Sequence, residues 1–325
     1  MTDLPGVPGP LPACRITAAI CTYERYDLLP GAIASVLGQS LPDGAFELIV
    51  IDNSPDPARS AREAAAFADH PGLTWRHEPR PGLSNARNVA ARLARAPVIA
   101  FLDDDARADP VWLASIAECF DQFGDAVKVV GGRIRPWWGA PRPDWLPDEM
   151  LGDITVVDLG PERRLLDEGE WVAGANIAFR VAALQDAGWF DTSLGRTGSG
   201  ASLLSAEETA LTDRIKAQGG LVAYDPLGAV DHWVDPERLT QRWFRRRAAW
   251  QAVSDYLRDP KGKMARRDQA WAGMKDFLIT CNPADRTMRG LALRREAPAD
   301  FRWQTSAVYN AVTAMLAGLD EQDDV

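Results

Sequence analysis

The stretch VIAFLDDD, residues 98–105, joins five apolar residues to three consecutive carboxylates. The apolar part has the length and composition of a strand that is buried on both faces of a sheet. Three adjacent carboxylates at the end of such a strand raise one another's pKa unless a cation neutralises them. Carboxylate oxygens are ligands that suit Mg²⁺ and Mn²⁺. The stretch therefore predicts a divalent metal site, and a solvated turn before the next helix is the alternative.

The same arrangement occurs twice before this stretch. RITAAICT (15–22) and FELIVI (46–51) are also continuous apolar runs, and polar residues cluster at 21–24 and 52–54. We expect strands and helices to alternate along the first 105 residues, with strands at 15–22, 46–51, 73–77 and 98–102 and helices at 28–39, 57–68 and 84–93. This alternation predicts an α/β fold with a Rossmann-like, mostly parallel sheet flanked by helices. Ligands of such sheets bind at the carboxyl ends of the strands, where the polar clusters fall.

The second half has a looser pattern. We expect helices at 111–123 and 206–218, strands at 127–134, 171–180 and 221–224, a Trp/Pro loop at 136–147 and a glycine-rich loop at 195–200 that could act as a lid. From about residue 237 the pattern is helical. The sequence thus predicts a flexible N-terminal tail (1–14), a catalytic domain (15–236) and a helical C-terminal extension (237–325).

Composition excludes several classes of protein. The chain has 325 residues, 46% of them hydrophobic, and a net charge of −10. Such a chain forms a real core, and its acidic balance argues against a nucleic-acid partner. The four cysteines form no CxxC pair, so neither a zinc site nor a disulfide framework is expected, and a cytoplasmic location is predicted. No run of about 18 apolar residues predicts a membrane span, and residues 1–13 lack the features of a signal peptide.

Two enzyme classes with related chemistry fit poorly. A haloacid-dehalogenase-type phosphatase needs a DxDxT/V signature near the chain start, and the sequence Asp103-Asp104-Asp105-Ala106-Arg107 lacks the Thr or Val. A dinucleotide-binding oxidoreductase needs GxGxxG after the first strand, and none is present.

Several short motifs occur in a fixed order around the aspartates. They are CTYER (21–25), SVLGQS (35–40), ELIVIDN (47–53), GLSNARN (82–88), FLDDD (101–105), GAN (174–176), GWFD (188–191), EET (207–209) and VDH (230–232). In this order they resemble glycosyltransferase family 2 over roughly residues 15–235. The resemblance implies a GT-A fold, a nucleotide-diphosphate sugar donor for which we expect a UDP-sugar, and a divalent metal, Mn²⁺ or Mg²⁺.

The resemblance also implies roles for individual residues. Thr22 and Tyr23 would line the nucleobase pocket, opposite Asp52 and Asn53. Glu24, in the same turn, stands where the family usually has Asn, and Asn53 stands where Asp is common. The remaining implied positions are Arg87 near the nucleotide, Asp104 near the ribose, Asp103 and Asp105 as the outer members of the DxD metal motif, and His232 at the metal or the diphosphate.

Inverting sugar transfer needs a carboxylate that takes the proton of the acceptor hydroxyl. By its position in the family pattern Glu208 is the candidate base, and Glu207 is the reserve candidate. A structural alternative exists, because Ser205-Ala206-Glu207-Glu208 also reads as a capping box in which Glu208 bonds the N-cap amide.

Acceptor contacts are predicted from exposed aromatic residues. Trp171 and Trp138 are candidates to bind a sugar, lipid-linked or small-molecule acceptor, although a core role is the alternative for most of the 12 tryptophans. The basic aromatic segment RWFRRR (242–247) could lie on an anionic membrane surface, which would make the protein peripheral at the inner face of the membrane. The alternative is a helix that packs its aromatic residues on the core.

The sequence therefore predicts a metal-dependent inverting glycosyltransferase of hexosyltransferase type in polysaccharide or glycoconjugate synthesis. A non-catalytic nucleotide-sugar-binding protein of the same fold and a nucleotidyltransferase are the alternatives. The sequence does not indicate an oligomeric state.

Overall fold

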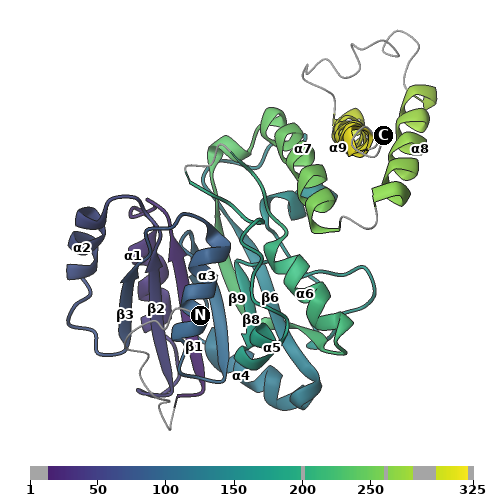
Figure 1. Cartoon of the computed structure of the whole chain (residues 1–325). Helices are drawn as coiled ribbons and strands as arrows, with labels where there is room; N and C mark the ends of the chain where they lie inside the picture. Colours follow the sequence, from purple (N-terminus) through teal and green to yellow (C-terminus); the bar gives the residue numbers. More distant parts are fainter. Residues whose placement is uncertain (1–13, 199–201, 260–262, 281–297, 321–325) are drawn as a thin grey trace.

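The computed structural model describes residues 14–198, 202–259, 263–280 and 298–320 (Figure 1). The predicted N-terminal tail over residues 1–13 and the end of the glycine-rich loop therefore lie outside the described residues.

The first half is a parallel α/β unit, as predicted. Its elements are β1 (Ile16–Thr22), α1 (Leu29–Leu37), β2 (Phe46–Asp52), α2 (Pro57–Ala65), β3 (Leu73–His77), α3 (Leu83–Leu93) and β4 (Val98–Asp103). β1 pairs in parallel with both β2 and β4, and β2 pairs in parallel with β3. The register places Thr22 beside Asp52 and Cys21 beside Asp103, so the polar strand ends meet at one edge of the sheet.

The second half adds strands of mixed direction. Its elements are β5 (Ala106–Ala108), α4 (Trp112–Phe123), η1 (Gly124–Ala126), β6 (Val127–Trp138), η2 (Asp148–Ile154), β7 (Arg164–Leu165), β8 (Asn176–Arg180), α5 (Val181–Asp186), α6 (Glu207–Ala217), β9 (Leu221–Val234) and η3 (Pro236–Arg238). Within the described chain the strands form one sheet in the order β3-β2-β1-β4-β8-β6-β9-β5, and β7 also pairs with β9. β8 is antiparallel to β4 and β6, and β5 is antiparallel to β9. The prediction of a mostly parallel sheet is therefore correct for the first half, whereas the second half is mixed.

Two strands are longer than predicted. β6 continues through Trp138, because its end pairs with Trp233 and Val234 of β9. The Trp/Pro loop prediction is therefore wrong for residues 136–138. β9 continues past Asp225, which is fully buried and bonds Ser115 Oγ at 2.6 Å.

Helices cover both faces of the sheet. One face packs against the apolar sides of α1 and α4, including Ile33 and the fully buried Trp112. The other face packs against α3, α5 and α6, where Val89, Leu184 and Leu211 contribute. The sheet is thus the middle of three layers, as expected for strands that are apolar on both sides.

The C-terminal extension consists of α7 (Gln241–Arg258), α8 (Lys263–Thr280) and α9 (Pro298–Asp320), which lie at one end of the molecule (Figure 1). Trp243 and Phe244 of α7 are buried in a cluster with Met150 of η2 and Phe301 of α9. The aromatic residues of the basic segment therefore pack inward, as the core-packing alternative predicts, and are not available to a membrane surface. None of the described helices is long and apolar enough to cross a membrane.

Candidate active site

A pocket of about 480 Å³ opens at the carboxyl edge of the parallel strands. All the predicted site residues except Asp52 and Trp138 line it: Thr22, Tyr23, Glu24, Asn53, Arg87, Asp103, Asp104, Asp105, Trp171, Glu207, Glu208 and His232. These residues come from segments that are far apart in the sequence, so the fold assembles one site from them.

Asp103, Asp105 and His232 form the acidic end of the pocket. Each offers a ligand atom, and these atoms lie within 4.8 Å of one another. Pairing of β5 with β9 sets Ala106 opposite His232, and Trp233 N–H donates to Asp105 O at 2.8 Å. His232 Nδ1 is buried and has no hydrogen-bond partner within the described chain. Two carboxylates and an imidazole are a donor set that fits Mn²⁺ or Mg²⁺.

Positive groups surround Asp105. His232 Nε2 lies 3.2 Å from Asp105 Oδ1, and Arg25 Nη2 and Arg238 Nη2 lie 3.1 and 3.9 Å from Oδ2. Burial alone would raise the pKa of Asp105, but His232, Arg238 and Arg25 hold it well below its usual range. Burial and the neighbouring charge of Asp105 raise the pKa of Asp104. Asp105 is therefore held more firmly as an anion than Asp104.

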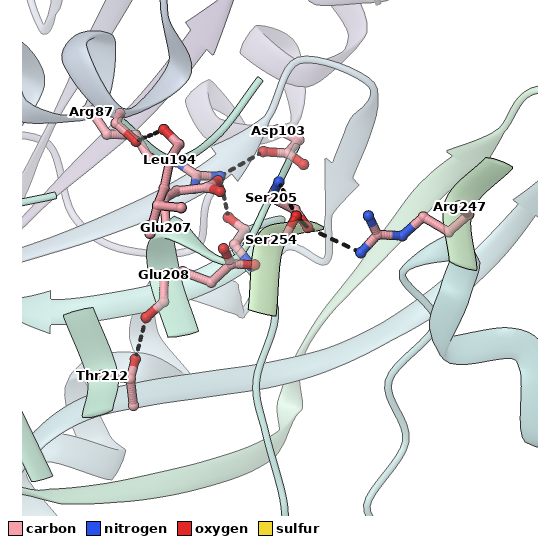
Figure 2. A network of polar contacts seen from close by, with 11 residues as sticks. Arg87, Asp103, Leu194, Ser205, Glu207, Glu208, Thr212, Arg247 and Ser254 are labelled. Atoms are coloured by element: carbon pink, nitrogen blue, oxygen red, sulfur yellow. Dashed lines mark hydrogen bonds and ion pairs between the residues drawn. The ribbon is translucent and has the colours of Figure 1, made fainter. Parts of the chain in front are cut away.

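Arg87 connects this acidic end to the glutamate pair (Figure 2). Its Nη1 donates to Glu207 Oε1 at 2.8 Å, and its Nη2 donates to Asp103 Oδ1 and Gly174 O, each at 3.2 Å. Only 3% of the Arg87 side chain is exposed, so the ion pair with Glu207 is shielded from water. A Cβ at position 174 would lie 2.5 Å from Arg87 Nη2, which explains the need for glycine there.

Glu207 and Glu208 begin α6, where the positive end of the helix dipole favours carboxylates. The capping-box alternative is wrong, because the N-cap residue is Ala206, in a left-handed conformation with φ 76° and no side-chain cap. Ser205 Oγ instead accepts from Arg247 Nη2 at 3.1 Å, and Glu208 Oε1 accepts from Gly174 N–H at 3.3 Å. Glu208 is thus available for a role other than capping.

The two glutamates differ in their ion-pair and hydrogen-bond partners. Burial, then the charge of Glu208, raises the pKa of Glu207 to about 7, although Arg87 opposes the rise. Both glutamates line the pocket, and each has one buried oxygen, Oε2, without a hydrogen-bond partner in the described chain. They differ in that Arg87 holds the other oxygen of Glu207, whereas Glu208 Oε1 accepts only from the neutral Gly174 N–H among the described residues.

Asp52 and Asn53, which were predicted to lie at the nucleobase, form hydrogen bonds with other residues of the protein. Asp52 is fully buried and accepts from Tyr26 Oη at 2.9 Å, and it lies outside the pocket lining. Asn53 Nδ2 donates to the carbonyls of Glu78 and Arg80 at 2.7 and 2.6 Å, and its Oδ1 accepts from Gly82 N–H at 2.7 Å. Direct base contact is therefore not supported for Asp52, and the amide of Asn53 serves first to shape the adjoining loop.

Comparison with known proteins agrees with this site. A protein-family model described as "Glycosyl transferase family 2" matches residues 17–171. The chain is 29% identical over 269 residues to the glucosyl-dolichyl phosphate glucuronosyltransferase of Haloferax volcanii, and the alignment covers 82% of this chain and 83% of that protein. These matches support a family 2 glycosyltransferase.

Solved structures show that this glycosyltransferase has the GT-A fold. The mannosyltransferase PcManGT of Pyrobaculum calidifontis, solved with GDP-Man and Mn²⁺, superposes with a TM-score of 0.59 at 20% identity and covers 98% of this chain and 91% of its own. S. aureus TarS 1-349, solved with UDP, superposes with a TM-score of 0.53 at 17% identity and covers 93% of this chain and 91% of its own.

The acceptor side of the glycosyltransferase differs from the prediction. Trp171 is 43% exposed and lines the pocket beside η2, where Gly152 and Thr155 also contribute. Trp138 lies outside the pocket lining, because it packs against the cluster of η2, α7 and α9. Of the two tryptophans predicted to bind the acceptor, Trp171 therefore lines the pocket and Trp138 does not.

Sequence reasoning missed the arginines of the pocket. Four that were not predicted line it: Arg25, Arg196, Arg238 and Arg247. Arg25 directly follows the recognised CTYE turn, which was a usable signal. The other three lie on later loops and on α7, and only the tertiary fold brings them to the site.

Proposed function

We propose that this glycosyltransferase transfers a hexose from a UDP-sugar to a hydroxyl acceptor with inversion of the anomeric carbon, and that it needs a divalent metal. The observation that carries the proposal is one pocket with two ends. At one end the ligand atoms of Asp103, Asp105 and His232 lie within 4.8 Å of one another. At the other end Glu207 and Glu208 each have a carboxylate oxygen without a partner among the described residues, and Arg87 binds Glu207 but not Glu208. The complexes of TarS with UDP and of PcManGT with GDP-Man and Mn²⁺ support the nucleotide and metal parts of the proposal.

In this proposal, residues of the chain accept the proton of the acceptor hydroxyl and provide the metal site that stabilises the charge on the diphosphate. Asp103, Asp105 and His232 would hold the metal, which when bound would neutralise charge that develops on the leaving diphosphate. Glu208 takes the proton of the acceptor hydroxyl while the oxygen of that hydroxyl forms a bond to the anomeric carbon. The bond from that carbon to the phosphate oxygen breaks on the opposite side, and UDP leaves with the bonding electron pair.

Arg87 and Trp171 have supporting roles in this proposal. Arg87 contacts both Asp103 and Glu207, so it fixes the distance between the metal end and the base end. Trp171 offers an exposed aromatic face to a sugar ring of the acceptor. The acceptor is a sugar or a lipid-linked molecule in glycoconjugate synthesis, a class that the name of the Haloferax volcanii relative represents.

The test compares Glu208→Gln with the wild type in three measurements. Loss of a general base lowers turnover by about 10²–10⁴-fold, so we expect the release of UDP from UDP-sugars to collapse. Melting temperature and calorimetric UDP affinity should stay unchanged, because the base need not contact the nucleotide. Asp213→Asn is the matched control, since Asp213 is exposed on the same helix.

Four results would oppose parts of the proposal. Unchanged turnover of Glu208→Gln would remove Glu208 as the base. Donor binding without any turnover by the wild type would instead support a non-catalytic nucleotide-sugar-binding protein. Equal UDP affinity in Mn²⁺ and in EDTA would contradict the metal requirement, and tighter binding of GDP than of UDP would correct the donor.

A further inference from the structure

Arg247 of the C-terminal extension lines the pocket and forms no salt bridge in the described part of the chain, although the charges of Asp153, Glu208 and Asp255 act on it (Figure 2). Its Nη1 donates to Leu203 O at 3.1 Å, and its Nη2 donates to Ser205 Oγ at 3.1 Å and to Gln251 Oε1. All three acceptors are neutral oxygens, and Arg247 forms no ion pair in the described part of the chain. The bonds therefore fix the guanidinium without neutralising it.

Arg196 adds a second positive charge to the same region. It lines the pocket, and its side chain makes no hydrogen bond or ion pair within the residues that the structure describes. Burial lowers the pKa of Arg247, Asp153 opposes this effect, and the nearby charge of Arg196 lowers the pKa further. Two like charges that face one pocket without an ion-pair partner are typical of a site that receives an anion.

Arg247 bonds residues away from the metal end, whereas the charge of Arg196 acts on both Arg247 and Arg238. Arg25 and Arg238 are the arginines that contact Asp105, where the diphosphate of the donor is expected. Arg247 instead bonds Ser205, three residues before Glu208, and the charge of Glu208 acts on it. An anion held by Arg196 and Arg247 would thus lie beside the proposed base, where the two sugars meet.

We propose that Arg196 and Arg247 form a subsite for a negatively charged group, a carboxylate or a phosphate, carried by one of the two sugar substrates. The proposal rests on the proposed function, since it assigns substrate charge at that same site. A carboxylate on the transferred sugar would make the donor a uronic acid derivative. A phosphate on the acceptor would make the acceptor a phosphorylated glycan or lipid.

Two pairs of probes distinguish these sources by calorimetry on the full chain with Mn²⁺. UDP-glucuronate and UDP-glucose differ only in the carboxylate of the donor. Glucose 6-phosphate and glucose, added to protein saturated with UDP, test the acceptor side. In one of the two pairs we expect the charged ligand to bind the wild type at least about tenfold more tightly than the uncharged ligand does. The reason is that hydrogen bonds to a charged group contribute more to binding than hydrogen bonds between neutral groups.

Three variants complete the experiment. Arg247→Gln and Arg196→Gln should each abolish the advantage of the charged ligand, whereas Arg242→Gln, an exposed position on the same helix as Arg247, should keep it. Arg196→Gln keeps the test decisive if Arg247→Gln fails to fold, because the Arg196 side chain makes no bond that folding would lose. A UDP affinity that is unchanged in both variants shows that the diphosphate is not what they bind.

The proposal is overturned if neither pair shows a preference for the charged ligand, or if the preference survives both substitutions. It is also overturned if the variants lose affinity for UDP itself. Failure of wild-type protein to bind UDP with Mn²⁺ is a different result, which overturns the proposed donor and this subsite with it.

Discussion

Replacing Arg87 with Met tests whether the buried link between the metal end and the glutamate pair determines the stability of the site. The substitution removes the 2.8 Å bond to Glu207 and leaves that carboxylate 5% exposed with no cation beside it. Breaking a buried ion pair on one side costs about 3–5 kcal/mol. At about 2–4 °C per kcal/mol for a domain of this size, we expect the melting temperature to fall by about 6–20 °C.

The cost should depend on pH, because Glu207 can escape it by taking up a proton. Burial and Glu208 already raise the pKa of Glu207 to about 7, and loss of Arg87 removes the charge that opposes this rise. We therefore expect a smaller loss at pH 6 than at pH 8.5 in metal-free thermal and urea unfolding. Arg92→Met is the control, since Arg92 is an exposed arginine on the same helix.

A double-mutant cycle gives the result that would refute this reasoning. Arg87→Met combined with Glu207→Leu removes both charges, so the double variant should be more stable than the sum of the single effects predicts, by about 1–3 kcal/mol. Additive losses, or a loss for Arg87→Met that is the same at both pH values, would show that the pair does not carry the stability assigned to it.

Two further predictions concern neighbouring groups. Because the folded-state pKa of Glu207 is raised from 4.5 to about 7, its stabilising effect is present below pH 4.5 and is lost as pH rises through 7. Urea unfolding should therefore show the wild type losing about 3 kcal/mol relative to Glu207→Gln between pH 4.5 and 8, and a constant difference would contradict the shift. Asn53→Asp replaces an amide that donates to two carbonyls with a carboxylate that repels them, so it should cost about 1–3 kcal/mol. An unchanged melting temperature for Asn53→Asp would show that these bonds contribute nothing.

The sequence predicts the parallel half of the fold well because each strand there is a continuous apolar run that ends at polar residues. β3 has the predicted bounds, and β1, β2 and β4 match within one residue. The second half is harder because its strands continue through residues that usually end them. β9 passes through Asp225-Pro226-Leu227-Gly228, a sequence that is typical of a turn. The buried Asp225 carboxylate is satisfied by tertiary partners such as Ser115 Oγ, which the local sequence does not indicate.

Some residues of the candidate site could likewise be predicted from the sequence, and others could not. The carboxylates and His232 could be predicted because they follow strands or belong to recognisable motifs. Arg196 lies in the glycine-rich loop (195–200) and Arg247 in the basic segment (242–247), but neither pattern predicts a place in the pocket, since the role of an arginine depends on the neighbours that the fold gives it. The capping box failed for a related reason: the left-handed conformation of Ala206 is imposed by the surrounding structure and not by local preference.

The assembly of the pocket from distant segments has a consequence for the order of folding. Arg87 and Glu207 are 120 residues apart in sequence, whereas the paired residues Ile16 of β1 and Phe46 of β2 are 30 residues apart. Contacts of such large separation form late, because the entropy of closing a long loop must be overcome first. A bound nucleotide that spans the completed pocket therefore cannot help the early folding transition state. It would stabilise the glycosyltransferase by slowing its unfolding and would leave its folding rate almost unchanged.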